Sequence, residues 1–278
     1  MVEQRIPVEL SGISETLLGN LGRRAAAARF GALKDPMAIE VADRLKYDFA
    51  DSNRGARLHA ARVATFDAAV RRFLGSHPAG TVVALGEGLE TQFWRLDNGK
   101  VRWLTVDLPE TIDLRHRLLP DGARQSTHRG SALDLDWLDG LEPTGPILVT
   151  AQGLLPYFQR DQVHDLIAGI AERLPGSLLV FDVVPEAMLK LVRRASGRER
   201  DLAVDLWTWL FNPGERAAIG AIPGCRGASR RRCAAHPRCG VAGHSGARAP
   251  PTAVALLNAS DRRPAGQTPQ RLRALALA

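Results

Sequence analysis

The sequence predicts an α/β fold with a Rossmann-like parallel sheet, a helical cover before it and a basic segment after it. Three observations support this prediction. A strand-like run at 81–84 leads into a glycine turn that contains Gly86 and Gly88. Asp107 ends a second such run about 20 positions later, a spacing typical of the nucleotide-binding half of a Rossmann unit. Beyond it, strand-like and helix-like stretches alternate, which favours parallel pairing through helical crossovers.

Residues 1–79 are expected to form the helical cover. The stretch 14–28 is rich in helix formers, and 37–47 has apolar residues at helical spacing after an Asp-Pro pair. The stretch 58–74 continues this spacing until Pro78 stops it.

Residues 80–224 are expected to form the α/β core. Apolar runs of strand length predict strands at 81–85, 101–107, 147–151 and 177–183, and a weaker segment at 125–132 is a candidate for a further strand. Helical spacing predicts helices at 89–96, 109–119, 160–174, 185–195 and 202–210.

Residues 225–278 differ in composition from the rest of the chain. They hold ten arginines against a single acidic residue, Asp261, and no Phe, Trp or Tyr. A segment with so few large apolar residues cannot offset its ordering entropy, so we expect a disordered tail and a sheet whose last strands are missing. Because the change is abrupt near Gly224, we hypothesise a lost reading frame, which the coding DNA around codon 224 would test.

The tail also explains the net charge of +7. Its arginines carry the excess, so the preceding residues are mildly acidic and give no electrostatic argument for a nucleic-acid partner. A basic arm for nucleic acid or membrane stays an alternative for the tail itself. No stretch approaches the roughly 18 apolar residues of a membrane span, and the N-terminus lacks a secretory pattern, so we expect a cytoplasmic protein.

A zinc site in the tail is a second alternative. Cys233, His236, Cys239 and His244 are ligand types for zinc, but their spacing matches no common finger. We therefore predict no metal, and cysteines that stay reduced.

The glycine turn leaves two cofactor classes open. A dinucleotide-binding turn usually has a third glycine, and Thr91 occupies that position. A nucleotide-dependent oxidoreductase is thereby disfavoured, although it stays an alternative. Methyltransferases that use S-adenosylmethionine keep the first two glycines and the acidic residue.

Several motifs in consistent order resemble the leucine carboxyl methyltransferase and TcmP-like polyketide O-methyltransferase family, over roughly residues 30 to 224. They lie at 34–38, 61–63, 83–91, 95–96, 106–110, 132–137, 151–158 and 181–182. The resemblance implies a class I methyltransferase sheet and S-adenosylmethionine as cofactor. It also implies methyl transfer to a carboxylate or hydroxyl of a small, polyketide-like molecule.

The resemblance assigns cofactor-binding roles to five residues of the core. Gly86 and Gly88 would face the amino-acid and ribose portion of the cofactor, and Asp107 would bind the ribose hydroxyls. Asp134 would accept from the adenine amino group, and Leu135 would border the ring. Alternatively, Asp134 caps a helix.

Two further residues receive roles from the resemblance. Arg62 would pair with the methionine carboxylate, a task suited to a planar bidentate donor, or would be a solvated charge on its helix. Gln152 would bind near the cofactor's amino group, where the family often has an acidic residue. Glu90 replaces the family's usual Asp after the glycine turn.

No catalytic residue can be assigned from the sequence. A carboxylate acceptor is ionised at neutral pH and needs no general base, whereas a phenol would need one. His59 and His164 are the bases to inspect. A catalytically silent homologue is the remaining alternative, because the last strands of the sheet are expected to be absent. The methyl acceptor and the oligomeric state are not predicted.

Overall fold

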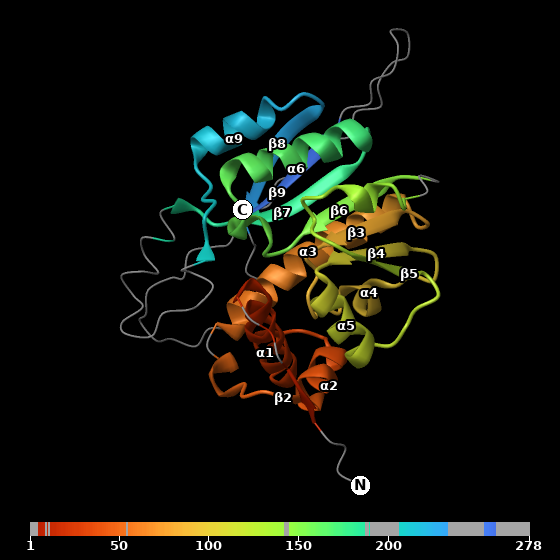
Figure 1. Cartoon of the computed structure of the whole chain (residues 1–278), viewed down its shortest axis with the longest axis vertical. Coiled ribbons are helices and arrows are strands. Elements are labelled where there is room, and N and C mark those ends of the chain that lie inside the picture. Colours follow the sequence, from red (N-terminus) through yellow and green to blue (C-terminus); the bar gives the residue numbers. More distant parts are fainter. Residues whose placement is uncertain are drawn as a thin grey trace.

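The computed structural model describes residues 5–8, 10, 12–53, 55–141, 145–186, 189, 206–232 and 253–259. For 12–13, 226–232 and 253–259 it describes the backbone alone. The N-terminal elements are β1 (Ile6–Pro7), η1 (Gly12–Glu15), α1 (Thr16–Arg29), α2 (Pro36–Arg44), β2 (Leu45–Lys46), η2 (Ala50–Asn53) and α3 (Ala56–Ser76). Figure 1 shows α1 and α2 at the lower end of the molecule, below the sheet.

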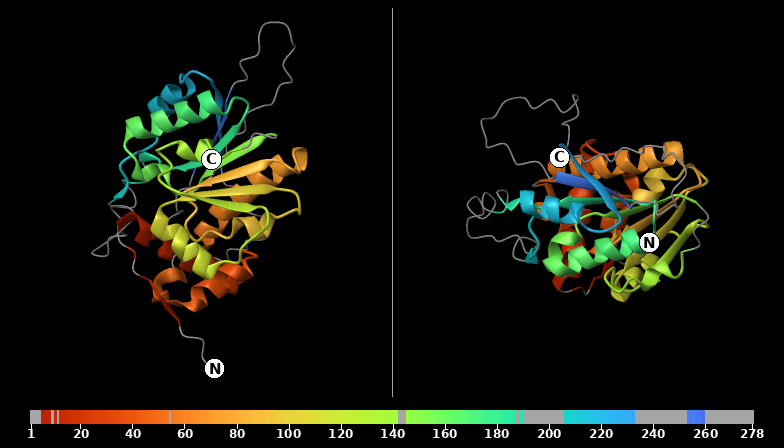
Figure 2. Two further views of the ribbon diagram at one scale, coloured as in Figure 1. Left: turned by 45° about the vertical axis from the view of Figure 1, so that its right-hand side comes forward. Right: turned by 90° about the horizontal axis from the view of Figure 1, so that it is seen from above.

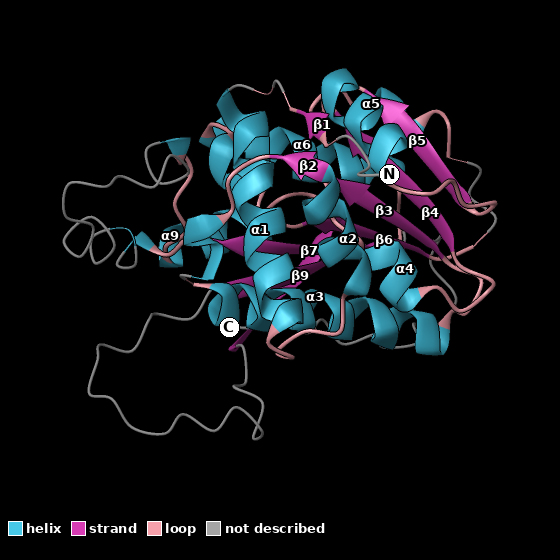
Figure 3. Ribbon diagram, turned by 90° about the horizontal axis from the view of Figure 1, so that it is seen from below, coloured by secondary structure: helices cyan, strands magenta, loops and turns pink. Residues whose placement is uncertain are grey.

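The core elements follow as strands and helices in alternation. They are β3 (Thr81–Leu85), α4 (Gln92–Leu96), β4 (Arg102–Asp107), α5 (Pro109–Leu118), β5 (Gln125–Arg129), η3 (Asp136–Leu138), β6 (Ile147–Ala151), η4 (Leu155–Tyr157), α6 (Arg160–Arg173), β7 (Leu178–Val183), α9 (Pro213–Gly220), β8 (Cys225–Arg232) and β9 (Ala253–Ala259). They form a seven-stranded sheet in the order β5-β4-β3-β6-β7-β9-β8, which the labels of Figure 1 show. Figure 3 shows the same sheet from below, with every strand except β8 labelled. The first five strands are parallel, and β9 runs antiparallel to β7 and β8. The predicted α/β class is confirmed.

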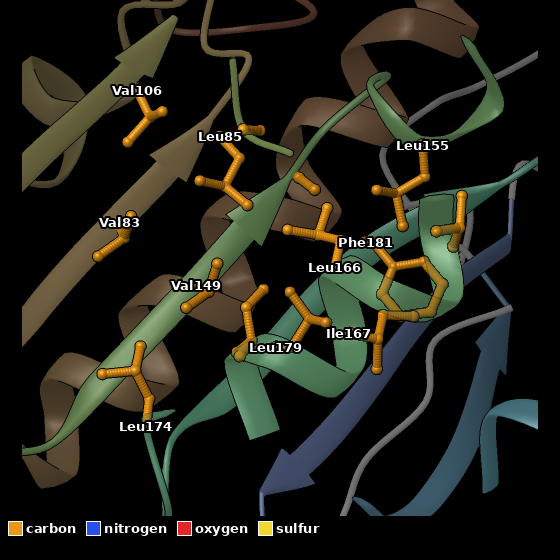
Figure 4. Close-up of a cluster of buried hydrophobic side chains, with 14 of the residues drawn as sticks. Val83, Leu85, Val106, Val149, Leu155, Leu166, Ile167, Leu174, Leu179 and Phe181 are labelled. Carbon is orange, nitrogen blue, oxygen red and sulfur yellow. The ribbon is translucent and has the colours of Figure 1, made fainter. Parts of the chain in front are cut away.

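Helices cover both faces of this sheet, because successive side chains of a strand point to opposite faces and both sets are apolar. Val82 and Ala84 pack with Phe66 and Val70 of α3. Val83 and Leu85 belong to the core that α6 covers, and the right-hand view of Figure 2 shows α3 and α6 on opposite sides of the sheet. Figure 4 shows α6 side chains reaching those of the strands. Doubly covered parallel strands read as continuous apolar runs, which is why the sequence predicts them well.

The expectation that the last strands are missing is wrong for the described backbone. Residues 225–232 and 253–259, both within the predicted tail, form β8 and β9 and complete the sheet beyond β7. Strand pairing depends on backbone hydrogen bonds, which an arginine-rich sequence supplies as well as any other. Residues 233–252 and 260–278 lie outside the described part, and with them the candidate zinc ligands Cys233, His236, Cys239 and His244. The reading-frame hypothesis stays a prediction.

The segment after β7 also differs from expectation. The predicted helix at 202–210 is not helical at 207–210, because the N–H groups of Thr208 and Trp209 donate to the Pro156 carbonyl. The next helix, α9, was not predicted, although its start carries a local signal. Asn212 caps it by accepting from the Glu215 N–H at 2.9 Å, and a proline opens it.

Within the described ranges, no helix combines the length and apolarity needed to cross a bilayer. The same ranges contain no group of three or more His, Cys, Asp or Glu side chains suited to a metal ion.

Candidate active site

A pocket lies at the carboxyl ends of β3, β4 and β6, and residues of α1 and α3 complete its wall. Ligands of open α/β sheets bind at this edge, since the turns after parallel strands meet there. Five of the seven residues predicted to bind the cofactor line this pocket: Arg62, Gly86, Gly88, Asp107 and Gln152. The structure therefore brings most of the predicted site together.

The glycine turn after β3 forms the floor of the pocket with backbone that only glycine adopts easily. Gly86 and Gly88 have φ angles of 58° and 57°, in the left-handed region. A Cβ at Gly86 would lie 2.7 Å from Cδ1 of Leu154, and one at Gly88 would lie 3.3 Å from Cβ of Leu17. Because these two positions carry no side chain, the backbone of the turn itself borders the pocket. A side chain at either position would occupy that space.

Asp107 stands at the end of β4 and is fixed by backbone donors. Its Oδ2 accepts from the Gly88 N–H at 2.7 Å, and its Oδ1 accepts from the Leu108 N–H at 2.8 Å. Burial raises the pKa of the Asp107 carboxyl, although the two N–H donors favour the charged form. The Thr111 side chain is a third hydrogen-bond partner of this carboxylate, and the acceptor capacity that remains can receive a ligand hydroxyl.

Glu87, the central residue of the turn, points away into a buried polar cluster. Its carboxylate pairs with Nη2 of Arg115 at 3.0 Å, and it accepts from Thr105 Oγ1 and from Trp103 Nε1 at 3.2 Å. Burial raises the pKa of Glu87. Arg115 also donates to the carbonyl of Gly88, so this pair fixes the shape of the turn.

Arg62 enters the pocket from α3 and is held by Asp182, a residue of the motif at 181–182 to which the sequence assigned no role. Its Nε donates to Oδ2 of Asp182 at 2.6 Å, and Asp182 lies near the end of β7. The other carboxylate oxygen of Asp182 accepts from the Gly153 N–H at 2.7 Å. Since Arg62 and Asp182 are 120 positions apart, no local pattern could have revealed this pair.

Asp134 and Leu135 do not line the pocket. Asp134 is exposed, and Leu135 has a φ of 60° that turns its side chain onto Gly169 of α6. Ser131 and Ala132 line the pocket on this side instead. The adenine roles predicted for Asp134 and Leu135 stay predictions that this conformation does not support.

A cluster of five buried charges, here called the ion cluster, joins the helical cover to the glycine turn. It consists of Arg24, Asp35, Asp67, Glu90 and Arg95. Burial alone would raise the pKa of Glu90, but the nearby arginines hold that pKa below its usual range. This cluster was not predicted from the sequence. Asp67, between the apolar Phe66 and Val70 on a core-facing helix surface, was the available signal.

Of the two candidate bases, only His59 lines the pocket. Its side chain is buried, and no hydrogen-bond partner for its Nε2 lies in the described part of the chain. Burial, followed by the charges of Arg62 and Arg24, holds the pKa of His59 well below its usual value, so the ring is neutral at neutral pH. His164 lies elsewhere and pairs with Glu215 at 3.0 Å.

The lowered pKa of His59 predicts a specific loss of stability in acid. The unfolded chain binds a proton at His59 near pH 6.5 whereas the folded chain does not, so unfolding becomes easier as the pH falls through that value. Between pH 7.5 and 5.5, the wild type should lose about 1 kcal/mol more unfolding free energy than H59Q. Urea titrations of both proteins at the two pH values measure this difference. Parallel pH dependence would contradict the prediction.

Sequence comparisons connect the chain to known enzymes. A sequence model described as leucine carboxyl methyltransferase matches residues 18–171. The tetracenomycin polyketide synthesis O-methyltransferase TcmP of Streptomyces glaucescens is 31% identical over 225 residues, which cover 79% of this chain and 82% of that protein. The S-adenosyl-L-methionine-dependent methyltransferase dpfgK of Gibberella zeae is 31% identical over 191 residues, covering 61% of this chain and 64% of that protein.

Solved structures share the fold. A DUF574 family protein from Streptomyces avermitilis gives a TM-score of 0.59 at 17% identity, covering 85% of this chain and 96% of that one. The N-methyltransferase NodS of Bradyrhizobium japonicum, in complex with S-adenosyl-L-homocysteine, gives a TM-score of 0.50 at 16% identity. That match covers 82% of this chain and 98% of NodS.

Proposed function

The chain belongs to the leucine carboxyl methyltransferase family and is an S-adenosylmethionine-dependent methyltransferase, and from this premise we propose that it methylates an oxygen of a small molecule. The proposed acceptor is a carboxylate or hydroxyl of a polyketide-like compound, since the relative TcmP is an O-methyltransferase of polyketide synthesis. Because the chain belongs to this family, the alternative of a nucleotide-dependent oxidoreductase is dropped.

The chemistry of the pocket supports this cofactor. The Asp107 carboxylate, which accepts a hydrogen bond from the Gly88 N–H of the glycine turn, offers its remaining acceptor capacity to the ribose hydroxyls. Arg62 lines the same pocket and offers a positive charge for the methionine carboxylate, with Gln152 nearby for its amino group. The placement of Asp107 against Gly88 at the carboxyl edge of the sheet is the observation on which the proposal depends.

When bound, the cofactor supplies a methyl group already activated by its positive sulfur. The chain's own part is to align an acceptor and exclude water. Leu17 of α1, Leu154 and Phe158 supply apolar wall for this purpose. A carboxylate acceptor needs no base; for a hydroxyl acceptor, the neutral imidazole of His59 is the base available in the wall.

The direct test combines binding and turnover. Calorimetry with S-adenosylmethionine should give saturable binding and calorimetry with NADH none, and a panel of carboxylic acids and phenols should then reveal the acceptor class. Binding without turnover on any member would favour the silent homologue. Absence of S-adenosylmethionine binding would refute the proposal.

We expect Asp107→Ala to weaken S-adenosylhomocysteine binding by about 1–3 kcal/mol, because hydrogen bonds to a charged group are lost. Titration calorimetry measures the change in Kd. Asp97→Ala is the matched control, since Asp97 also accepts a backbone N–H, from Gly99 at 2.9 Å, but does not line the pocket. Equal affinity of Asp107→Ala and wild type would count against the assigned ribose site.

A further inference from the structure

One carboxylate joins three elements at the edge of the pocket. Asp182 of β7 accepts from Nε of Arg62 at 2.6 Å and from the N–H of Gly153 at 2.7 Å. The side chains of Asp182 and Arg62 are only 7% and 13% exposed. A charge-assisted pair this short and this well shielded from water defines the position of the guanidinium closely.

Gly153 fits this arrangement only as glycine. Its φ of 71° lies in the left-handed region, and an added Cβ would lie 2.3 Å from Nη2 of Arg62. The guanidinium therefore lies directly over the loop that follows β6. The next residue, Leu154, lies over Gly86, so the same loop also contacts the glycine turn.

The two arginines that line the pocket differ in what they can still bind. Both Nη atoms of Arg24 are used: Nη1 donates to Glu90 and Nη2 donates to the Leu89 carbonyl, while Nε lies 3.3 Å from Asp35 as an ion pair without a hydrogen bond among the described residues. Arg62 bonds through Nε alone, and within the described residues its Nη1 and Nη2 have no hydrogen-bond partner.

From this geometry we propose that Asp182 is a positioning residue. It fixes Arg62 through Nε and the 152–154 loop through Gly153, so that the outer edge of the guanidinium receives the amino-acid carboxylate of the ligand in bidentate form. The inference rests on the proposed cofactor site. It makes recognition of the amino-acid end depend on β7, a strand that contributes no side chain to the lining of the pocket.

The test compares two ligands that share an adenosine. S-adenosylhomocysteine has the amino-acid carboxylate, whereas 5′-methylthioadenosine lacks the amino-acid part. Asp182→Asn should weaken S-adenosylhomocysteine binding about tenfold in calorimetry and leave methylthioadenosine binding within about twofold. Asp113→Asn is the matched control, because Asp113 also pairs with an arginine, Arg129, outside the pocket.

A double-mutant cycle separates positioning from general structural damage. In an Arg62→Met background, Asp182→Asn should have no further effect on S-adenosylhomocysteine binding. Equal losses for both ligands, or losses that add fully across the cycle, would overturn the inference while leaving the cofactor proposal intact. A wild type that binds neither ligand would overturn both. If Asp182→Asn does not fold, Gly153→Ala provides the second variant, because its Cβ displaces the same guanidinium.

Discussion

Replacing Arg95 with methionine is expected to lower the free energy of unfolding by about 3–5 kcal/mol. The Arg95 side chain is 6% exposed and pairs with Asp35 at 2.7 Å, Asp67 at 3.0 Å and Glu90 at 2.8 Å. It also donates to Thr91 Oγ1. Methionine fills most of the space but leaves three buried carboxylates with too little positive charge. Urea denaturation followed by far-ultraviolet circular dichroism measures the loss.

Arg71→Met is the matched control for this prediction. Arg71 also pairs with Asp67, at 3.6 Å, but its side chain is 59% exposed, so its removal should cost less than about 1 kcal/mol. The pH dependence gives a second readout. Arg95 is one of the two arginines that hold the pKa of Glu90 below its ordinary value of 4.5, so wild type loses this stabilisation as the pH falls below that value, and Arg95→Met should lose less. Equal losses of unfolding free energy in Arg95→Met and Arg71→Met would show that burial does not determine how strongly these ion pairs stabilise the fold.

The second large effect is expected for Trp137→Ala, at about 3–5 kcal/mol of unfolding free energy. Trp137 is fully buried in the core between the sheet and α6, and its Nε1 donates to the Ala132 carbonyl at 3.1 Å. Alanine leaves a large cavity and frees the loop that carries Ala132 and Ser131 into the pocket. Thermal and urea denaturation give the stability change, and S-adenosylhomocysteine titration gives the accompanying loss of affinity.

Trp137→Phe separates packing from hydrogen bonding at this position. Phenylalanine keeps most of the ring but leaves the Ala132 carbonyl without its donor, which should cost about 1–3 kcal/mol. A loss for phenylalanine as large as that for alanine would assign the whole effect to the hydrogen bond. No loss in either variant would contradict the buried placement of this side chain.

The parts of the fold that the sequence predicts are those whose signal is local. The strands at 81–85 and 147–151 are apolar throughout because both faces of the sheet are covered, and the structure has them at these bounds. The glycine turn and Asp107 could be recognised because their separation along the chain is itself the signal. β9 was missed because its run of Ala, Val and Leu lies within an arginine-rich context that dominated the composition.

The position of a site residue could be predicted where it depends only on the strand that the residue follows. Gly86, Gly88 and Asp107 need only their strands in register, whereas Asp182 gains its role from Arg62 on a distant helix. The adenine role of Asp134 stays a prediction, and the structure places this residue outside the pocket lining for a related reason. Its place depends on the positive φ of Leu135 and on the anchoring of Trp137, which are properties of the folded loop.

The position of β9 between β7 and β8 has a consequence for biosynthesis. A nascent chain emerges from the ribosome in order, so β8 leaves the exit tunnel before the strand that separates it from β7. Until residues 253–259 are translated, β8 has no neighbour in its final place, while the five parallel strands can already associate. This edge of the sheet is thus completed late in translation. In chains that stall before residue 253, β7 would be an unpaired edge strand that chaperones can bind.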